Sequence, residues 1–281
     1  MLPILLDLKY IKIYTFGVFL VLAFFWASFF LWRLIRLTSH KEEEIFDGLF
    51  LTLFGSLIFG RLTYVILHFS EFGFDILKFI LINGYPGLSL YGSLFGGFLV
   101  LYGYFFIKKI SFKEAIDYFI PPLYLALGFG KLGSFFSGVD VGTKTKFIIA
   151  VKYVGYDGLR HITPIYESIL FFVGAYLSFR ILFEIRKEKY PNGFTFVLFL
   201  WTFSLVYLVF DKLKDTRLYL GDISFNFIVS LVMLLTGSFY FLYYFRHLIF
   251  QYLGKVSNLF KSHVKTNKSR SNQAAAKKAG E

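Results

Sequence analysis

The chain has 281 residues, a formal net charge of +12 and a hydrophobic share of 57%, with a mean hydropathy of +0.62. That share exceeds the roughly 45–50% of soluble domains, and apolar runs of about 20 residues, enough to cross a bilayer, recur along the chain. The lack of cysteine excludes disulfides, a cysteine nucleophile and thiolate metal sites. Composition therefore predicts an all-α integral membrane protein. We attribute the positive charge to loops beside anionic lipid, and expect no nucleic-acid partner.

Seven membrane spans are predicted in chain order, at residues 15–31, 45–67, 88–107, 115–138, 164–183, 194–210 and 223–245. Residues 75–82 form a short amphipathic piece that we expect at the membrane interface. Residues 1–14 lack a basic start and a small-residue cleavage site, so we expect them to remain in the mature protein.

The loops alternate in charge, which predicts the orientation of the spans. Basic residues follow the first, third and fifth spans: Arg33, Arg36 and Lys41, then Lys108, Lys109 and Lys113, then Arg186, Lys187 and Lys189. The positive-inside rule then places the N-terminus outside and the C-terminus in the cytoplasm, which needs an odd number of spans. We expect residues 1–250 to form one transmembrane bundle with an outward-facing lipid pocket. Residues 251–281 read as a basic, disordered cytoplasmic tail.

Lys131 and Arg61 are two of the basic residues that fall within the predicted spans. Lys131 stands in the glycine-rich segment 128–138, and an ionisable group in the bilayer costs roughly 3 kcal/mol on insertion scales, so a bound anion is expected beside it. Arg61 lies in the outer part of the second span, where it either serves function or reaches toward the interface. Together the two cations suit the phosphodiester of a membrane lipid.

Other polar residues in or beside the spans have less specific readings. Tyr91 precedes Gly92 and Gly96, which form a small-xxx-small face for close helix packing. Residues 211–214 end the sixth span with charges that are ordinary at an interface.

His161 and Glu167 stand at the entrance of the fifth span. His161 is the best general-base candidate by its ordinary pKa, although a lone histidine can also be structural. Glu167 falls near the start of the predicted helix, so it is either functional or a first-turn acid favoured by the helix dipole.

Familiar catalytic signatures are missing from the sequence. It has no Gly-x-Ser-x-Gly elbow, no His-Glu-x-x-His, no P-loop and no dinucleotide fingerprint, so we expect neither a cofactor nor a metal. The residues alone predict a membrane protein with an outward-facing pocket for anionic lipid.

Four blocks resemble, in order, the bacterial prolipoprotein diacylglyceryl transferase family. Residues 60–64 resemble its Gly-Arg block, and residues 87–92 its Gly-Met-Ser-Phe-His-Gly block. Residues 117–142 resemble its signature region, and residues 160–167 its Arg-His-Pro-Ser-Gln-Leu-Tyr-Glu block. The resemblance runs from about residue 14 to residue 245 and implies the seven-span fold.

The chain departs from the family within the signature, which reads Gly-Arg-Leu-Gly-Asn-Phe-Ile-Asn-Gly-Glu. Lys131 replaces the arginine, Ser134 and Ser137 replace the asparagines, and Val139 replaces the glutamate, with Asp140 adjacent. Elsewhere, three further positions differ. Tyr91 stands in place of a histidine, Phe16 in place of a tyrosine and Tyr207 in place of an arginine.

The resemblance implies transfer of a diacylglyceryl group from phosphatidylglycerol to the lipobox cysteine of a prolipoprotein, in the bacterial plasma membrane. Residues expected to bind substrate are Arg61, Lys131, Ser134, Ser137 and Tyr207. Residues expected in catalysis are Tyr91, His161 and Glu167. The alternative is a non-catalytic relative that binds lipid or acts as a scaffold. A transporter is a weaker reading, since the sequence has no two related halves.

Overall fold

The computed structural model describes residues 2–8, 11–82, 84–215, 219–220, 223–247 and 250–251. Seven helices in this part of the chain are long and apolar enough to cross a membrane: α1 (Thr15–Ile35), α2 (Glu42–Leu67), α5 (Leu90–Lys108), α6 (Phe112–Ser137), α7 (Thr163–Arg186), α8 (Phe194–Asp211) and α9 (Phe225–Tyr244). The prediction of a seven-span all-α membrane protein is confirmed. The predicted tail lies outside the described residues from residue 252 on.

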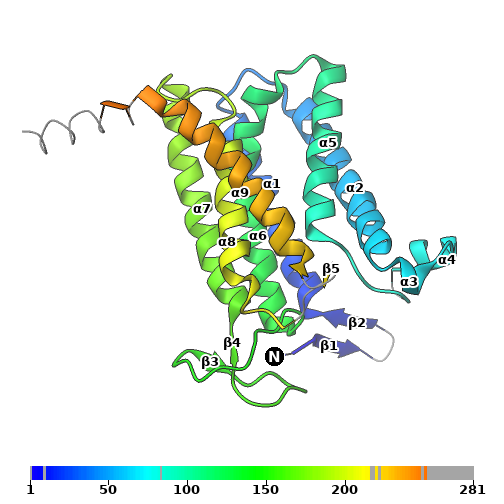
Figure 1. Cartoon of the computed structure of the whole chain (residues 1–281). Coiled ribbons are helices and arrows are strands. Elements are labelled where there is room, and N and C mark those ends of the chain that lie inside the picture. The colour runs from blue at the N-terminus through cyan, green and yellow to red at the C-terminus, as the bar shows by residue number, and fades with distance from the viewer. Residues whose placement is uncertain are drawn as a thin grey trace, which may run out of the picture.

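Short elements join the long helices. They are α3 (Phe69–Phe72), α4 (Ile76–Ile80) and three antiparallel pairs: β1 (Ile4–Leu8) with β2 (Ile11–Tyr14), β3 (Ala150–Val151) with β4 (Arg160–His161), and β5 (Tyr219–Leu220) with β6 (Ile223–Ser224). The first two hairpins lie at the same end of the bundle (Figure 1). The amphipathic piece at residues 75–82 contains α4, whose first amides donate to the Asp75 carboxylate. Its place at the membrane interface stays a prediction.

Small residues let α2 and α5 pack closely. A Cβ atom added at Gly92 would lie 2.3 Å from Thr63 Oγ1, and one at Gly96 would lie 2.1 Å from the Cβ of Phe59. Both glycines therefore face α2, and side chains of α2 occupy the space that a Cβ atom at either position would take. The predicted small-xxx-small face is confirmed, in line with helix association in lipid through close van der Waals packing.

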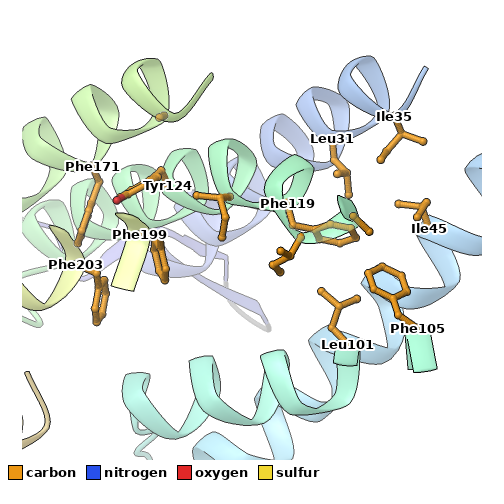
Figure 2. Packing of buried hydrophobic residues seen from close by; sticks show 14 of the residues in the cluster. Leu31, Ile35, Ile45, Leu101, Phe105, Phe119, Tyr124, Phe171, Phe199 and Phe203 are labelled. Carbon is orange, nitrogen blue, oxygen red and sulfur yellow. The ribbon is translucent and has the colours of Figure 1, made fainter. Parts of the chain in front are cut away.

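Aromatic side chains fill the space between α5, α6, α7 and α8 (Figure 2). Phe203 is central, with ring centroids 5.4 Å from Phe199, 6.0 Å from Phe171 and 4.6 Å from Tyr207. Offset and edge-on ring contacts add about 0.5–1.5 kcal/mol each beyond the area they bury. This aromatic core packs against Tyr207, which in turn lies beside a group of buried charged residues.

A buried carboxylate on α6 caps the start of α8, at the end of the bundle opposite the hairpins. Asp117 accepts hydrogen bonds from the amides of Gly193, at 2.6 Å, and Thr195, at 3.0 Å. The first amides of a helix have no partner within it, so a carboxylate there is favourable for both hydrogen bonding and the helix dipole. Asp117 thereby fixes α8 against α6.

Candidate active site

A cluster of buried charges lies where α6 ends, α7 begins and α8 has just ended. Glu167 on α7 is 0% exposed, Lys131 on α6 is 9% exposed and Lys214, three residues beyond α8, is 7% exposed. Lys131 Nζ lies 2.8 Å from Glu167 Oε2, and Lys214 Nζ pairs with Glu167 Oε1. One carboxylate thus bridges two ammonium groups that come from separate elements.

Asp140 completes the cluster. Helix α6 stops at Gly138, which adopts the left-handed conformation (φ 74°) and turns the chain back, as is common at a helix end. Asp140 Oδ2 then lies 2.9 Å from Lys131 Nζ. The charge of Lys131 and a hydrogen bond from Ser134 hold the pKa of Asp140 below its usual range, against the opposing effect of burial. A carboxylate is therefore retained one residue beyond Val139.

Tyr207 lies against both lysines. Its ring centroid is 5.2 Å from Lys131 Nζ and 4.1 Å from Lys214 Nζ, so each ammonium group gains a cation–π contact. The Tyr207 hydroxyl is buried and has no hydrogen-bond partner among the described residues. Tyr207 thus places a buried hydroxyl without a described hydrogen-bond partner beside two cations.

Sequence reasoning missed Lys214. The sequence reads residues 211–214 as ordinary interface charges, whereas Lys214 and Asp211 are buried within the protein. The place of this segment at the membrane interface stays a prediction. Backbone hydrogen bonds draw the segment inward: Thr143 donates to Leu213 at 2.8 Å and Asp215 donates to Val141 at 2.9 Å. Pairing between such distant segments leaves no local sequence signal. Burial, and secondarily the charge of Lys131, lowers the pKa of Lys214.

Arg160 ties the loop after α6 to the segment after α8. Its Nη1 donates to the Asp215 carboxylate at 2.7 Å and to the Gly142 carbonyl at 3.0 Å. The guanidinium also lies 4.7 Å from the ring centroid of Tyr156. These contacts hold the two segments that carry Asp140 and Lys214 over the end of the bundle.

Among the contacts described for Tyr91, the one that leads to the cluster is with the ring of Tyr207. The Tyr91 hydroxyl lies 2.5 Å from Ser230 Oγ on α9, and its ring centroid is 5.7 Å from that of Tyr207. Its predicted catalytic role is not tested by this geometry and stays a prediction.

Arg61 binds backbone carbonyls. It is 2% exposed, and its three donor nitrogens donate to the carbonyls of Lys78 at 2.6 Å, Phe79 at 3.0 Å and Gly87 at 2.9 Å. These bonds hold α4 and the segment that follows it against α2. The contacts described for Arg61 do not join it to Lys131, and the cation that shares a partner with Lys131 is Lys214. A role for Arg61 as a phosphate ligand stays a prediction.

Glu167 does not fit the reading of a first-turn acid. Helix α7 begins at Thr163, so Glu167 is its fifth residue, and its carboxylate is paired with lysines. That reading is therefore wrong.

The remaining predicted residues lie around the cluster. His161 packs its ring against Phe147, at 6.0 Å, and Tyr166, at 6.5 Å, and no described contact joins it to Glu167. Ser137 Oγ donates to the Gly133 carbonyl within α6, at 2.7 Å. The roles predicted for His161 and Ser137 stay predictions.

Several buried polar atoms at this end of the bundle lack a hydrogen-bond partner within the described part of the chain. They are Tyr153 Oη, Arg160 Nε, His161 Nδ1, Thr163 Oγ1 and Tyr207 Oη. Each such atom costs about 1–3 kcal/mol unless water or a ligand satisfies it. Two lysines can bind a phosphate, and hydroxyls without a hydrogen-bond partner can bind alcohol groups. The site therefore suits a ligand that carries both.

Comparisons with known proteins agree with this chemistry. A family model described as prolipoprotein diacylglyceryl transferase matches residues 3–243. The chain is 28% identical over 247 residues to the phosphatidylglycerol–prolipoprotein diacylglyceryl transferase of Clostridium tetani, covering 85% of this chain and 96% of that protein. The protein of the same name from Chlorobaculum tepidum is 29% identical over 252 residues, covering 82% and 84%. That from Clostridium botulinum is 30% identical over 215 residues, covering 73% and 82%.

Proposed function

Because this chain belongs to the prolipoprotein diacylglyceryl transferase family, we infer that it transfers a diacylglyceryl group from phosphatidylglycerol to prolipoproteins. It is a multi-pass membrane enzyme with seven apolar helices. The observation that carries the assignment of the site is the buried bridge of Lys131, Glu167 and Lys214 at one end of the bundle. We place the protein in the bacterial plasma membrane, with this end outside.

The proposed acceptor is the thiol of the lipobox cysteine. Its sulfur forms a bond to the terminal glyceryl carbon, and the bond from that carbon to the phosphate oxygen breaks. The oxygen keeps the electron pair, so glycerol phosphate leaves, and the thiol proton passes to a base. The chain itself has no cysteine, so the nucleophile comes from the prolipoprotein.

Lys131 and Lys214 are the proposed phosphate ligands. Charge builds on the leaving phosphate as the carbon–oxygen bond breaks, and two fixed ammonium groups in a site of low dielectric stabilise it. In the ligand-free site, Glu167 and Asp140 balance the two lysines. An incoming phosphate therefore competes with Glu167 for the lysines.

Glu167 is the proposed proton acceptor. Once the phosphate takes over its lysine partners, its carboxylate is free to receive the thiol proton. Tyr91, Ser134, Ser137 and Tyr207 are proposed to hydrogen-bond the glycerol or phosphate oxygens. His161 is the alternative base, although Glu167 is the candidate within the cluster.

The direct test is transfer in proteoliposomes that contain labelled phosphatidylglycerol and a lipobox peptide, with or without its cysteine. Wild-type protein should label only the cysteine-containing peptide and release glycerol phosphate. Lys131→Ala should abolish transfer, because a neutral side chain cannot bind phosphate, whereas Lys131→Arg should preserve it. Equal activity of wild type and Lys131→Ala would rule out the assigned site. Folded protein that binds phosphatidylglycerol but transfers nothing would indicate the non-catalytic relative.

A further inference from the structure

Tyr153 is the one inward residue of an otherwise exposed stretch. It is 2% exposed, whereas every other residue from 151 to 159 is exposed. Burial of one large side chain within a surface loop requires a specific place for it in the fold. The hydroxyl of Tyr153 nevertheless has no hydrogen-bond partner among the described residues.

The loop is built to hold Tyr153 in this position. The amide of Tyr156 donates to the Tyr153 carbonyl at 3.2 Å, and Gly155, with a φ of 82°, allows the turn. At the base of the loop, the amide of Thr145 donates to the Leu159 carbonyl at 2.9 Å, and Arg160 bonds to Asp215. These contacts order the backbone on both sides of Tyr153, and its ring is buried in the ligand-free fold.

The ring of Tyr153 packs against the last part of α6, the helix that carries Lys131. Its centroid lies 6.5 Å from that of Phe135, which is one helical turn beyond Lys131 on the same face of α6. Burial raises the pKa of Tyr153 to about 12, and the Asp140 carboxylate adds to the rise. The hydroxyl thus stays protonated at neutral pH and lies within electrostatic reach of Asp140.

We propose that the Tyr153 hydroxyl binds the glycerol head group of phosphatidylglycerol, on the side of the phosphate away from the acyl chains. The assignment rests on the proposed function, because the two lysines must hold the phosphate. A neutral hydroxyl can both donate to and accept from an alcohol, and Asp140 offers a second acceptor nearby. The pair suits a diol, so Tyr153 selects among anionic lipids by head group.

The test compares phosphatidylglycerol with phosphatidylethanol, which has the same phosphodiester charge but no diol. Tyr153→Phe removes only the hydroxyl. It should lower kcat/KM for phosphatidylglycerol about 3- to 10-fold, the usual effect of one hydrogen bond, and leave phosphatidylethanol unchanged. Tyr104→Phe is the matched control, because its buried hydroxyl also lacks a described partner but lies on α5 away from the site. It should change neither lipid.

Soluble phosphates give a second measurement that does not depend on turnover. Purified wild-type protein should bind glycerol phosphate more tightly than ethyl phosphate in titration calorimetry, and Tyr153→Phe should remove that difference. An equal loss for both lipids and both phosphates would mean that Tyr153 only supports the loop, and no loss would also overturn the proposal. Failure of the proposed function looks different: wild-type protein would transfer neither lipid.

Discussion

At the scale of single residues, the cluster satisfies its own charges before a lipid binds. Glu167 and Asp140 are paired with Lys131, and Glu167 also pairs with Lys214. Removing one partner of a buried ion pair typically destabilises the fold by about 3–5 kcal/mol, because the remaining charge is left without compensation. The groups proposed to bind the ligand therefore also hold the cluster in shape.

Lys214 should set the alkaline limit of phosphate binding. Burial lowers its pKa from the ordinary 10.5, so the ammonium group loses its charge at a lower pH than a surface lysine. The affinity for glycerol phosphate should therefore fall as pH rises toward 10, and inhibition constants measured from pH 7 to pH 10 would show it.

Over the same pH range, the contribution of Lys214 to the free energy of unfolding should rise with pH, because the Lys214 amine binds its proton more tightly in the unfolded chain than in the folded one.

Lys214→Arg provides the control for this prediction. A guanidinium stays charged throughout the range, so its inhibition constants should not change with pH. An identical pH dependence in both proteins would mean that another group titrates.

The residues of the site were only partly predictable from sequence. Lys131 and Glu167 stand in recognisable blocks, and the cost of a lysine in an apolar segment marks Lys131 on physical grounds alone. Lys214 and Tyr153 could not be found this way. Each lies in a connecting segment, and each is buried by contacts with distant residues.

At the scale of elements, glycines determine how closely α2 and α5 approach. Gly96→Ala should destabilise the protein by about 1–3 kcal/mol, because the new methyl group would overlap Phe59 on the facing helix. Thermal unfolding in detergent measures this loss. Gly103→Ala, on the same helix, is the matched control: nothing lies within 4 Å of its added Cβ, so stability should be unchanged or slightly higher. Similar losses in both variants would contradict the packing argument.

Long helices were predictable and short strands were not. The span predicted at residues 194–210 differs from α8 (Phe194–Asp211) by a single residue, because an apolar run of that length has few alternatives in a bilayer. The strands β3 and β4 contain two residues each, which is too short for an alternating pattern. Their pairing depends on contacts across the loop.

At the scale of the whole molecule, the end of α6 and the start of α7, which carry the charge cluster, lie at the same end of the bundle as the strand pairs β1–β2 and β3–β4 (Figure 1). The basic loops predicted to be cytoplasmic follow α1, α5 and α7, at the other end. Their charge predicts which end faces out.

The absence of native cysteine allows a clean test of this orientation. Ile148→Cys, at a position 96% exposed beside β3, should react with a membrane-impermeant maleimide in intact spheroplasts. Lys187→Cys, just beyond the end of α7, should react only after permeabilisation. The reverse pattern would place the charge cluster in the cytoplasm and exclude a secreted acceptor.

The beginning of the chain is joined to the site-bearing helix. The Leu2 amide donates to the Phe136 carbonyl in the last turn of α6, at 3.0 Å, and the Thr15 amide donates to Pro3 at 3.0 Å. An affinity tag fused ahead of Leu2 would therefore start close to the last turn of α6. The last turn of α9, by contrast, lies at the opposite end of the bundle (Figure 1). Protein for the transfer and binding assays should therefore carry its tag at the C-terminus and keep its N-terminus native.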